Sequence, residues 1–102
     1  MGVIKISEES FKKEVLEESR TVLVDFYADW CGPCKMLSPI IEEVAKENED
    51  AKFVKINVDE AQELAIEYDI MSIPTIVVIK DGKEVNRTVG LIDKTEIRAM
   101  LK

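Results

Sequence analysis

The feature that most constrains the fold is a run of mostly apolar residues at 21–28, which contains one acidic residue, Asp25. Branched and aromatic side chains at consecutive positions are typical of a β-strand that is covered on both faces. Sheets of this kind have helices packed on them. The run therefore predicts the central strand of an α/β domain. The hydrophobic share of 46% over 102 residues allows one core, so we expect one domain spanning residues 1–102.

Strand and helix patterns alternate along the rest of the chain, without an internal repeat or a linker. Strands are predicted at residues 3–6, 52–58, 75–80 and 84–89, and the order is β-α-β-α-β-α-β-β-α. The early crossovers imply parallel neighbours. The dipeptide Asp81-Gly82 predicts a hairpin, which adds an antiparallel edge to the sheet.

Three helix starts are predicted from capping residues. Ser7 is expected to cap the first helix, which follows the first strand. Asp59 with Gln62, and Asp93 with Glu96, have the spacing of capping boxes for the last two helices.

The composition excludes several classes of function. The net charge is −7, from 14 basic and 21 acidic residues, which disfavours binding to nucleic acid or to anionic lipid. No apolar stretch is long enough to span a bilayer, and the first residues lack the apolar block of a secretory signal. We therefore expect a cytoplasmic protein. The chain has no histidine, so acid–base chemistry falls to carboxylates, lysines or thiols.

The only two cysteines, Cys31 and Cys34, lie where the central strand gives way to a long helix. Residues three apart share one helix face, so their α-carbons should lie about 5 Å apart, within reach of a disulfide. Pro33 suits the first helical turn. Cys31 would then meet the free N–H groups of the helix start, which stabilise a thiolate. Cys34 should be more buried and less acidic, so we expect Cys31 to attack and Cys34 to resolve.

Three other interpretations of the cysteine pair are less favoured. A zinc site would need two further Cys or His ligands, which one chain does not have, although two copies could share a metal. Plain core cysteines are disfavoured by the neighbouring Trp30, Gly32 and Pro33. A structural bridge over so short a loop would stabilise little. A redox pair without a bound metal is therefore favoured.

Two further residues, Asp25 and Trp30, can each be interpreted in more than one way. Asp25 in its apolar strand should have a raised pKa, which indicates a functional carboxyl rather than a satisfied buried polar group or a strand edge. Trp30 could pack in the core, but its place beside Cys31 favours the surface.

Residues 26–35, FYADWCGPCK, resemble the active-site segment of the thioredoxin family. The resemblance extends to residues 24–26, 55–59, 73–75 and 89–90, in order and at suitable spacing. It implies the thioredoxin fold, a central mixed sheet of about five strands flanked by about four helices. It also implies a dithiol–disulfide oxidoreductase, an electron carrier that reduces disulfides of other proteins.

The resemblance assigns roles to individual residues. Cys31 would be the nucleophile, Cys34 the resolving thiol, and Asp25 the buried carboxyl that relays a proton. Supporting positions are Lys55 near this aspartate, Gly32 and Pro33 as a bias toward reduction, and Pro74 as a cis-proline beside the disulfide. The substrate surface would be framed by Trp30, Ile73, Gly90 and Leu91. Leu91 is bulkier than the residue frequent there, which puts partner preference in doubt.

The expected partners are a thioredoxin reductase and disulfide-containing proteins, with a monomeric chain and no cofactor beyond the Cys31–Cys34 disulfide. No nucleotide-binding motif occurs in the sequence. Two rival functions are an oxidase or isomerase of the same fold, and a binding module that holds a partner without turnover. The latter would keep its function without both cysteines.

Overall fold

A computed structural model describes residues 2–102, so Met1 of the predicted domain lies outside it. Its centre is a five-stranded sheet in the order β1-β3-β2-β4-β5. The strands are β1 (Ile4–Lys5), β2 (Val22–Tyr27), β3 (Lys52–Asn57), β4 (Thr75–Lys80) and β5 (Lys83–Val89). The helical segments are the π-helical turn η1 (Lys12–Leu16), α1 (Gly32–Glu47), the 3₁₀ turn η2 (Val58–Glu60), α2 (Gln62–Glu67) and α3 (Lys94–Met100).

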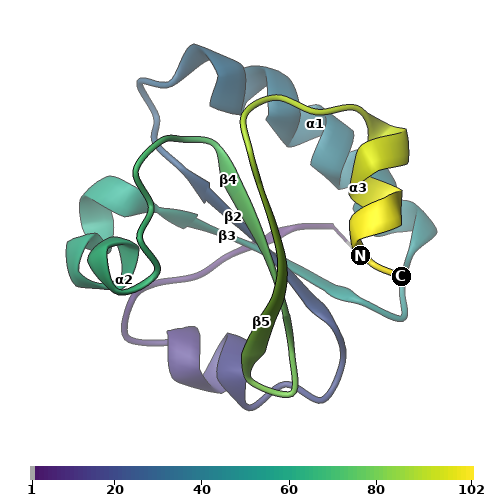
Figure 1. The fold of residues 1–102 in the computed structure, drawn as a ribbon, viewed down its shortest axis with the longest axis horizontal. Helices are drawn as coiled ribbons and strands as arrows, with labels where there is room; N and C mark the ends of the chain where they lie inside the picture. Colours follow the sequence, from purple (N-terminus) through teal and green to yellow (C-terminus); the bar gives the residue numbers. More distant parts are fainter. Residues whose placement is uncertain (1) are drawn as a thin grey trace.

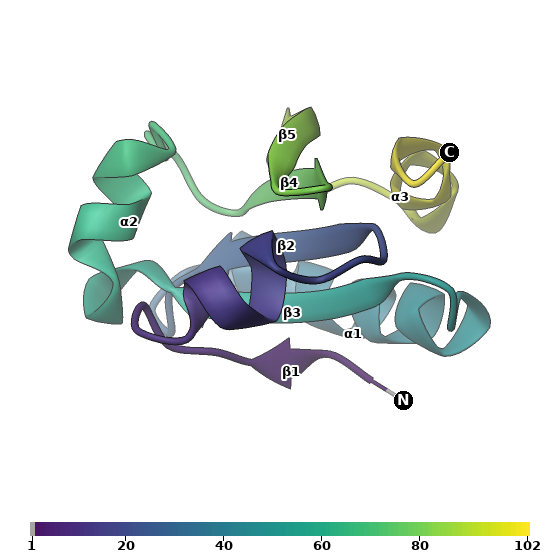
Figure 2. The same ribbon diagram turned by 90° about the horizontal axis from the view of Figure 1, so that it is seen from below.

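The sheet is mixed, as the sequence predicts. Strand β3 pairs in parallel with β1 and β2, whereas β4 pairs antiparallel with β2 and β5. Figure 2 shows the five strands stacked in this order, with β2 in the middle. The hairpin between β4 and β5 turns at Asp81 and Gly82, whose φ angles of 52° and 78° are those a type I′ turn requires. The predicted central strand and hairpin are confirmed.

The two faces of the sheet are covered by different helices. In Figure 1, α1 and α3 lie next to one another, and α2 lies at the opposite side of the strands. Successive side chains of β2 point to opposite faces. Leu23 packs in the core cluster of α1 and α3, whereas Val24 packs in the cluster of η1 and α2. Because Asp25 is two residues from Leu23, its carboxyl points toward α1.

Of the three predicted helix caps, only the one at Asp59 is wrong. The Ser7 hydroxyl accepts the backbone N–H of Ser10 at 3.2 Å, and the Ser10 hydroxyl accepts that of Ser7 at 3.1 Å, so Ser7 caps the turn that leads into η1 as predicted. Asp59 lies in η2, and α2 begins after Ala61 without a side-chain cap. The capping box of Asp93 and Glu96 on α3 is confirmed.

Candidate active site

Cys31 and Cys34 form a disulfide at the start of α1. Their α-carbons lie 5.2 Å apart, as the helical spacing predicts. Cys31 is the N-cap residue, and its Sγ accepts a hydrogen bond from the backbone N–H of Cys34 at 3.2 Å. In the reduced state, this donor and the positive end of the helix would stabilise a thiolate on Cys31.

The two cysteines are almost equally buried, with 5% of Cys31 and 4% of Cys34 exposed. The predicted difference in burial between Cys34 and Cys31 is therefore only one percentage point in the disulfide form. The reason is that the preceding loop and Ile73 cover Cys31, whose Sγ lies 3.8 Å from the carbonyl oxygen of Ile73. The difference between the two sulfurs lies in the helix cap, which Cys31 alone occupies.

Asp25 lies beneath the disulfide in a small cavity of about 130 Å³, which it shares with Cys34, Ser38 and Lys55. Only 3% of Asp25 is exposed, and its Oδ1 has no hydrogen-bond partner among residues 2–102. Burial raises the pKa of this carboxyl to about 7, and the charge of Lys55 lowers it by a smaller amount. A carboxyl that titrates near neutrality can exchange a proton with a neighbouring thiol.

Lys55 lies directly opposite Asp25 in the parallel pairing of β2 with β3. Its Nζ is 5.7 Å from the centre of the Tyr27 ring, close enough for a cation–π interaction. The ring therefore helps to hold the lysine above the cavity that contains the aspartate. The structure thus brings Lys55 to the place expected for it.

Trp30 is 70% exposed, so the surface interpretation is the right one. Its indole Nε1–H donates a hydrogen bond of 2.8 Å to Oδ2 of Asp59. This bond fixes the ring beside Cys31. The sequence assigned Asp59 to a helix cap, and no local pattern could reveal a partner 29 residues away.

The peptide bond between Ile73 and Pro74 is cis, as the resemblance implies. The carbonyl oxygen of Pro74 accepts the N–H of Gly90 at 2.8 Å, which brings these two predicted residues together. Gly90 has a φ of +96°, a conformation that side chains rarely adopt. Leu91, Gly32 and Pro33 are exposed.

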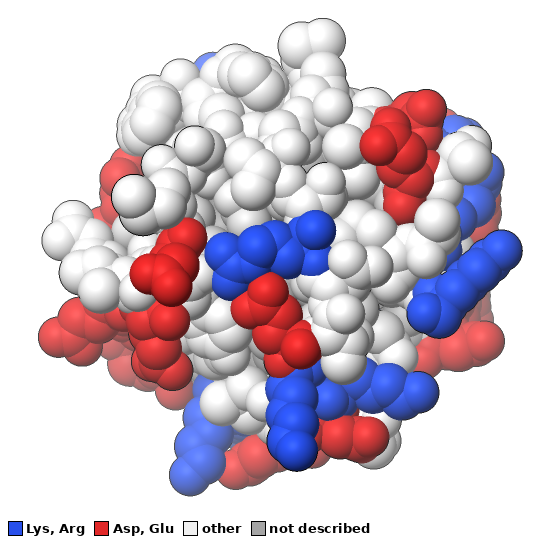
Figure 3. All heavy atoms as spheres, in the orientation of Figure 1, with Lys and Arg blue, Asp and Glu red and all other residues white. Residues whose placement is uncertain are grey.

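An apolar groove of about 480 Å³ extends from Trp30 between α2 and the loop before β4. Its lining includes Ile66, Met71 and Ile73, and none of its residues is charged. Ile66 and Met71 are 77% and 89% exposed, and no local pattern in the sequence marks either of them as a surface residue. Figure 3 shows uncharged side chains over the upper left, where α1 begins and where the chain passes from α2 to β4 in Figure 1. This face can bind an apolar polypeptide segment.

The chain matches the family model for thioredoxin over residues 2–102. It belongs to the thioredoxin family. It is 44% identical to the thioredoxin of Pyropia yezoensis over 102 residues, covering 99% of this chain and 95% of that one. It is 50% identical to the thioredoxin of Rickettsia felis over 93 residues, covering 90% and 89%. The thioredoxin of Mycoplasmoides gallisepticum is 49% identical over 89 residues, covering 87% and 89%.

The fold is the mixed α/β thioredoxin fold, and the protein is a thiol–disulfide oxidoreductase. As in other thioredoxins, the redox group is the chain's own disulfide, which becomes two thiols on taking up two electrons and two protons. Among residues 2–102 there is no cluster of three or more Cys, Asp or Glu residues that could hold a metal ion. Within the same residues, no helix is long and apolar enough to cross a membrane.

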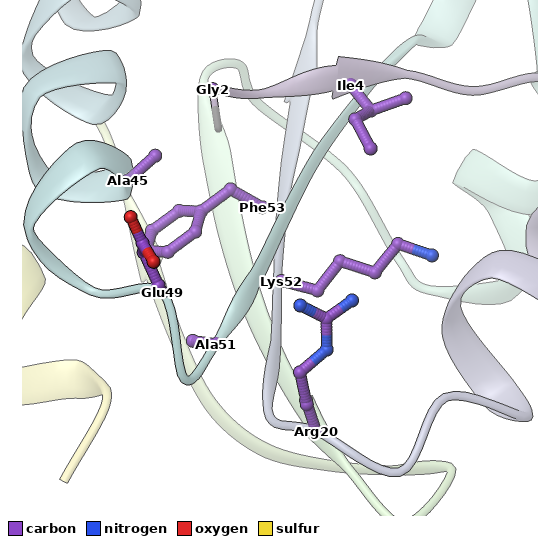
Figure 4. Close-up of a pocket in the computed structure, with 8 residues that line it drawn as sticks. All are labelled: Gly2, Ile4, Arg20, Ala45, Glu49, Ala51, Lys52 and Phe53. Carbon is purple, nitrogen blue, oxygen red and sulfur yellow. The ribbon is translucent and has the colours of Figure 1, made fainter.

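A further cavity, of about 260 Å³, lies near the C-terminal end of α1 and is shown in Figure 4. Its lining includes Ala45, which is about 20 Å along the helix from Cys31 at a rise of 1.5 Å per residue. Its cations are already paired, Arg20 with Glu18 at 3.0 Å and Lys52 with Glu14 at 2.7 Å. This cavity is separate from the thioredoxin site.

Proposed function

We propose that this protein reduces disulfide bonds in other proteins and that a thioredoxin reductase returns it to the dithiol form. The observation that carries the proposal is the position of Cys31, whose Sγ caps α1 beside the carbonyl of Ile73. A thiolate stabilised there lies next to Trp30 and Ile73, which line the groove where an extended polypeptide can bind. We further propose that the chain acts as one domain and as a monomer.

The reaction proceeds in two exchanges. The Cys31 thiolate attacks one sulfur of the substrate disulfide, forms a mixed disulfide, and releases the other substrate sulfur as a thiolate that takes up a proton. Cys34 then gives its proton to the Asp25 carboxylate and attacks Sγ of Cys31. The second substrate sulfur leaves as a thiolate that takes up a proton, and Asp25 gives up the proton it received. The substrate has then gained two electrons and two protons, and Cys31 and Cys34 have become a disulfide.

The two residues between the cysteines, Gly32 and Pro33, support the reducing direction by their resemblance to reducing members of the family. A reductant needs a compartment that keeps its thiols reduced, so we propose that the protein acts in the cytoplasm. Trp30, Ile73, Gly90 and Leu91 are proposed to contact the substrate. Lys55 and Pro74 are proposed to support Asp25 and the disulfide.

Reduction of insulin by dithiothreitol tests the activity. We expect a catalytic amount of this protein to accelerate precipitation of the insulin B chain well above the rate with dithiothreitol alone. Equilibration with glutathione buffers should give a reduction potential near −270 mV, the value typical of thioredoxins. A potential near −120 mV would instead indicate an oxidase. If the protein keeps its function after replacement of both cysteines, it is a binding module that holds a partner without turnover.

Trapping tests the assignment of the two thiols. Cys34→Ser should accumulate mixed disulfides on Cys31, because the second exchange is blocked. Cys31→Ser, the matched control, should accumulate essentially none. Equal trapping by the two variants would show that the roles of nucleophile and resolving thiol are not distinct.

A further inference from the structure

Arg87 on β5 forms hydrogen bonds with backbone carbonyls at the C-terminal end of α2. Its Nη2 donates to the carbonyl oxygen of Tyr68 at 2.6 Å, and its Nη1 donates to that of Asp69 at 3.4 Å. The guanidinium is itself held by Glu84, through Nε at 2.7 Å and Nη2 at 2.9 Å. A planar guanidinium can satisfy a carboxylate and two carbonyls at once, which a lysine ammonium cannot do with the same geometry.

The turn that ends α2 contains a residue in an unfavourable backbone conformation, which the contacts of Arg87 can stabilise. The N–H of Asp69 donates to the carbonyl of Ile66 and the N–H of Ile70 to that of Ala65, at 3.1 and 2.8 Å, which is the Schellman arrangement. This arrangement puts Asp69 in the left-handed region, with a φ of 53°, although glycine is the usual residue there. Arg87 binds the carbonyls at this turn, so it fixes the direction in which the chain leaves the helix.

The chain that leaves α2 is the docking segment, residues 70–74, which has no regular secondary structure and carries Ile73 and Pro74 to the disulfide. Strand β5 and the residue that follows it, Gly90, hold the two ends of this segment. Arg87 binds the carbonyls immediately before it, and the N–H of Gly90 binds the carbonyl of Pro74 at its end. Only three residues separate Asp69 from Ile73, so a shift at Arg87 is passed directly to the backbone beside Cys31.

We propose that Arg87 is a positioning residue for polypeptide substrates, acting through the carbonyls of Tyr68 and Asp69 on the docking segment. The inference rests on the proposed function, because it concerns how a protein substrate is held for exchange. A polypeptide contacts the docking segment on both sides of its disulfide. A small disulfide needs only the Cys31 sulfur. Loss of Arg87 should therefore affect the two classes of substrate differently.

The experiment compares reduced wild-type protein with Arg87→Ala in single-turnover reduction of insulin and of hydroxyethyl disulfide. We expect the rate constant for insulin to fall about fivefold, and that for the small disulfide to change less than about twofold. In the steady state, the insulin effect should appear in KM rather than in kcat. The matched control is Arg98→Ala, since Arg98 also pairs with one carboxylate, Glu47, at 2.7 Å on the other side of the sheet. It should change neither rate.

A purely structural role for Arg87 would slow both substrates by the same factor or neither, and either result overturns the proposal. If Arg87→Ala does not fold, Arg87→Lys carries the same test. Lysine keeps the positive charge but cannot reproduce the paired hydrogen bonds of the planar guanidinium. The ratio of the two rate constants should therefore still shift in favour of the small disulfide. The wild-type protein alone tests the proposed function. If it does not reduce insulin, the proposed function is contradicted, whatever the variants do.

Discussion

Asp25 and Lys55 lie opposite one another on neighbouring strands, yet the carboxyl keeps a pKa of about 7. Two effects oppose each other at this pair. Burial penalises the charged carboxylate, and the positive charge of Lys55 favours it. The burial effect is the larger one, because Asp25 has almost no exposed surface and one of its oxygens lacks a hydrogen-bond partner among residues 2–102. Asp25 can therefore accept a proton near neutral pH.

The raised pKa of Asp25 predicts that stability depends on pH. The carboxyl titrates at 3.8 when unperturbed and at about 7 in the folded protein, so folding takes up a proton between these values. Its stabilising contribution is full below about pH 4 and is lost as the pH rises through 7. The loss is on the order of 4 kcal/mol.

The substitution Asp25→Asn removes this titration. In urea unfolding of the disulfide form, the variant should match the wild type at pH 4 and exceed it at pH 8. A difference between the two proteins that is the same at both pH values would contradict a raised pKa.

Removing the charge of Lys55 should move the pH dependence of the second exchange. Lys55→Met takes away the one attraction that lowers the pKa of Asp25, so the carboxylate forms at higher pH. The midpoint for release of the reduced substrate should shift upward, as measured by stopped-flow reduction of insulin across pH 6–9. Lys46→Met, an exposed change on α1, is the control and should leave the midpoint where it is.

The hydrogen bond between Trp30 and Asp59 should affect protein substrates more than small ones. Asp59→Ala frees the indole, and the loss of one charge-assisted bond should slow insulin reduction by about threefold. Reduction of hydroxyethyl disulfide should not change. The neighbouring Glu60→Ala, which removes only an exposed ion pair to Lys5 at 3.3 Å, serves as the control. Equal effects from both substitutions would argue for a general loss of negative charge.

Met71 should contribute to substrate affinity through the apolar groove. Met71→Glu places a charge among uncharged lining residues, so it should raise the KM for insulin by about fivefold or more. Met71→Leu keeps an apolar side chain of similar volume and should change KM little. Steady-state kinetics with excess reductase distinguish the two variants. An unchanged KM in Met71→Glu would mean that substrates do not reach the groove.

The sequence predicted the features whose signals are local. The apolar run of β2, the Asp81-Gly82 turn and the cysteine pair at a helix start each depend on neighbouring residues, and all three are confirmed. Asp59 shows where such reasoning fails. Its spacing to Gln62 is typical of a cap, but in the folded chain Asp59 lies in η2 and accepts the indole N–H of Trp30.

The contacts of Arg87 could not be predicted for the same reason. Its carbonyl partners lie 18 and 19 residues away, and only the antiparallel return of β5 brings them within reach. The nearly equal burial of the two cysteines also depends on a residue far away in the sequence, because the carbonyl of Ile73, 42 residues along the chain, approaches Cys31.

The disulfide joins two residues that are three apart on the first turn of one helix. It ties no other element of the fold, so making or breaking the bond requires no change in the strand order or in the packing of the two core clusters. Each molecule can therefore pass through many cycles of oxidation and reduction without unfolding. The protein is therefore a reusable electron carrier. Its fold persists through each cycle, and only the sulfur–sulfur bond is broken and formed again.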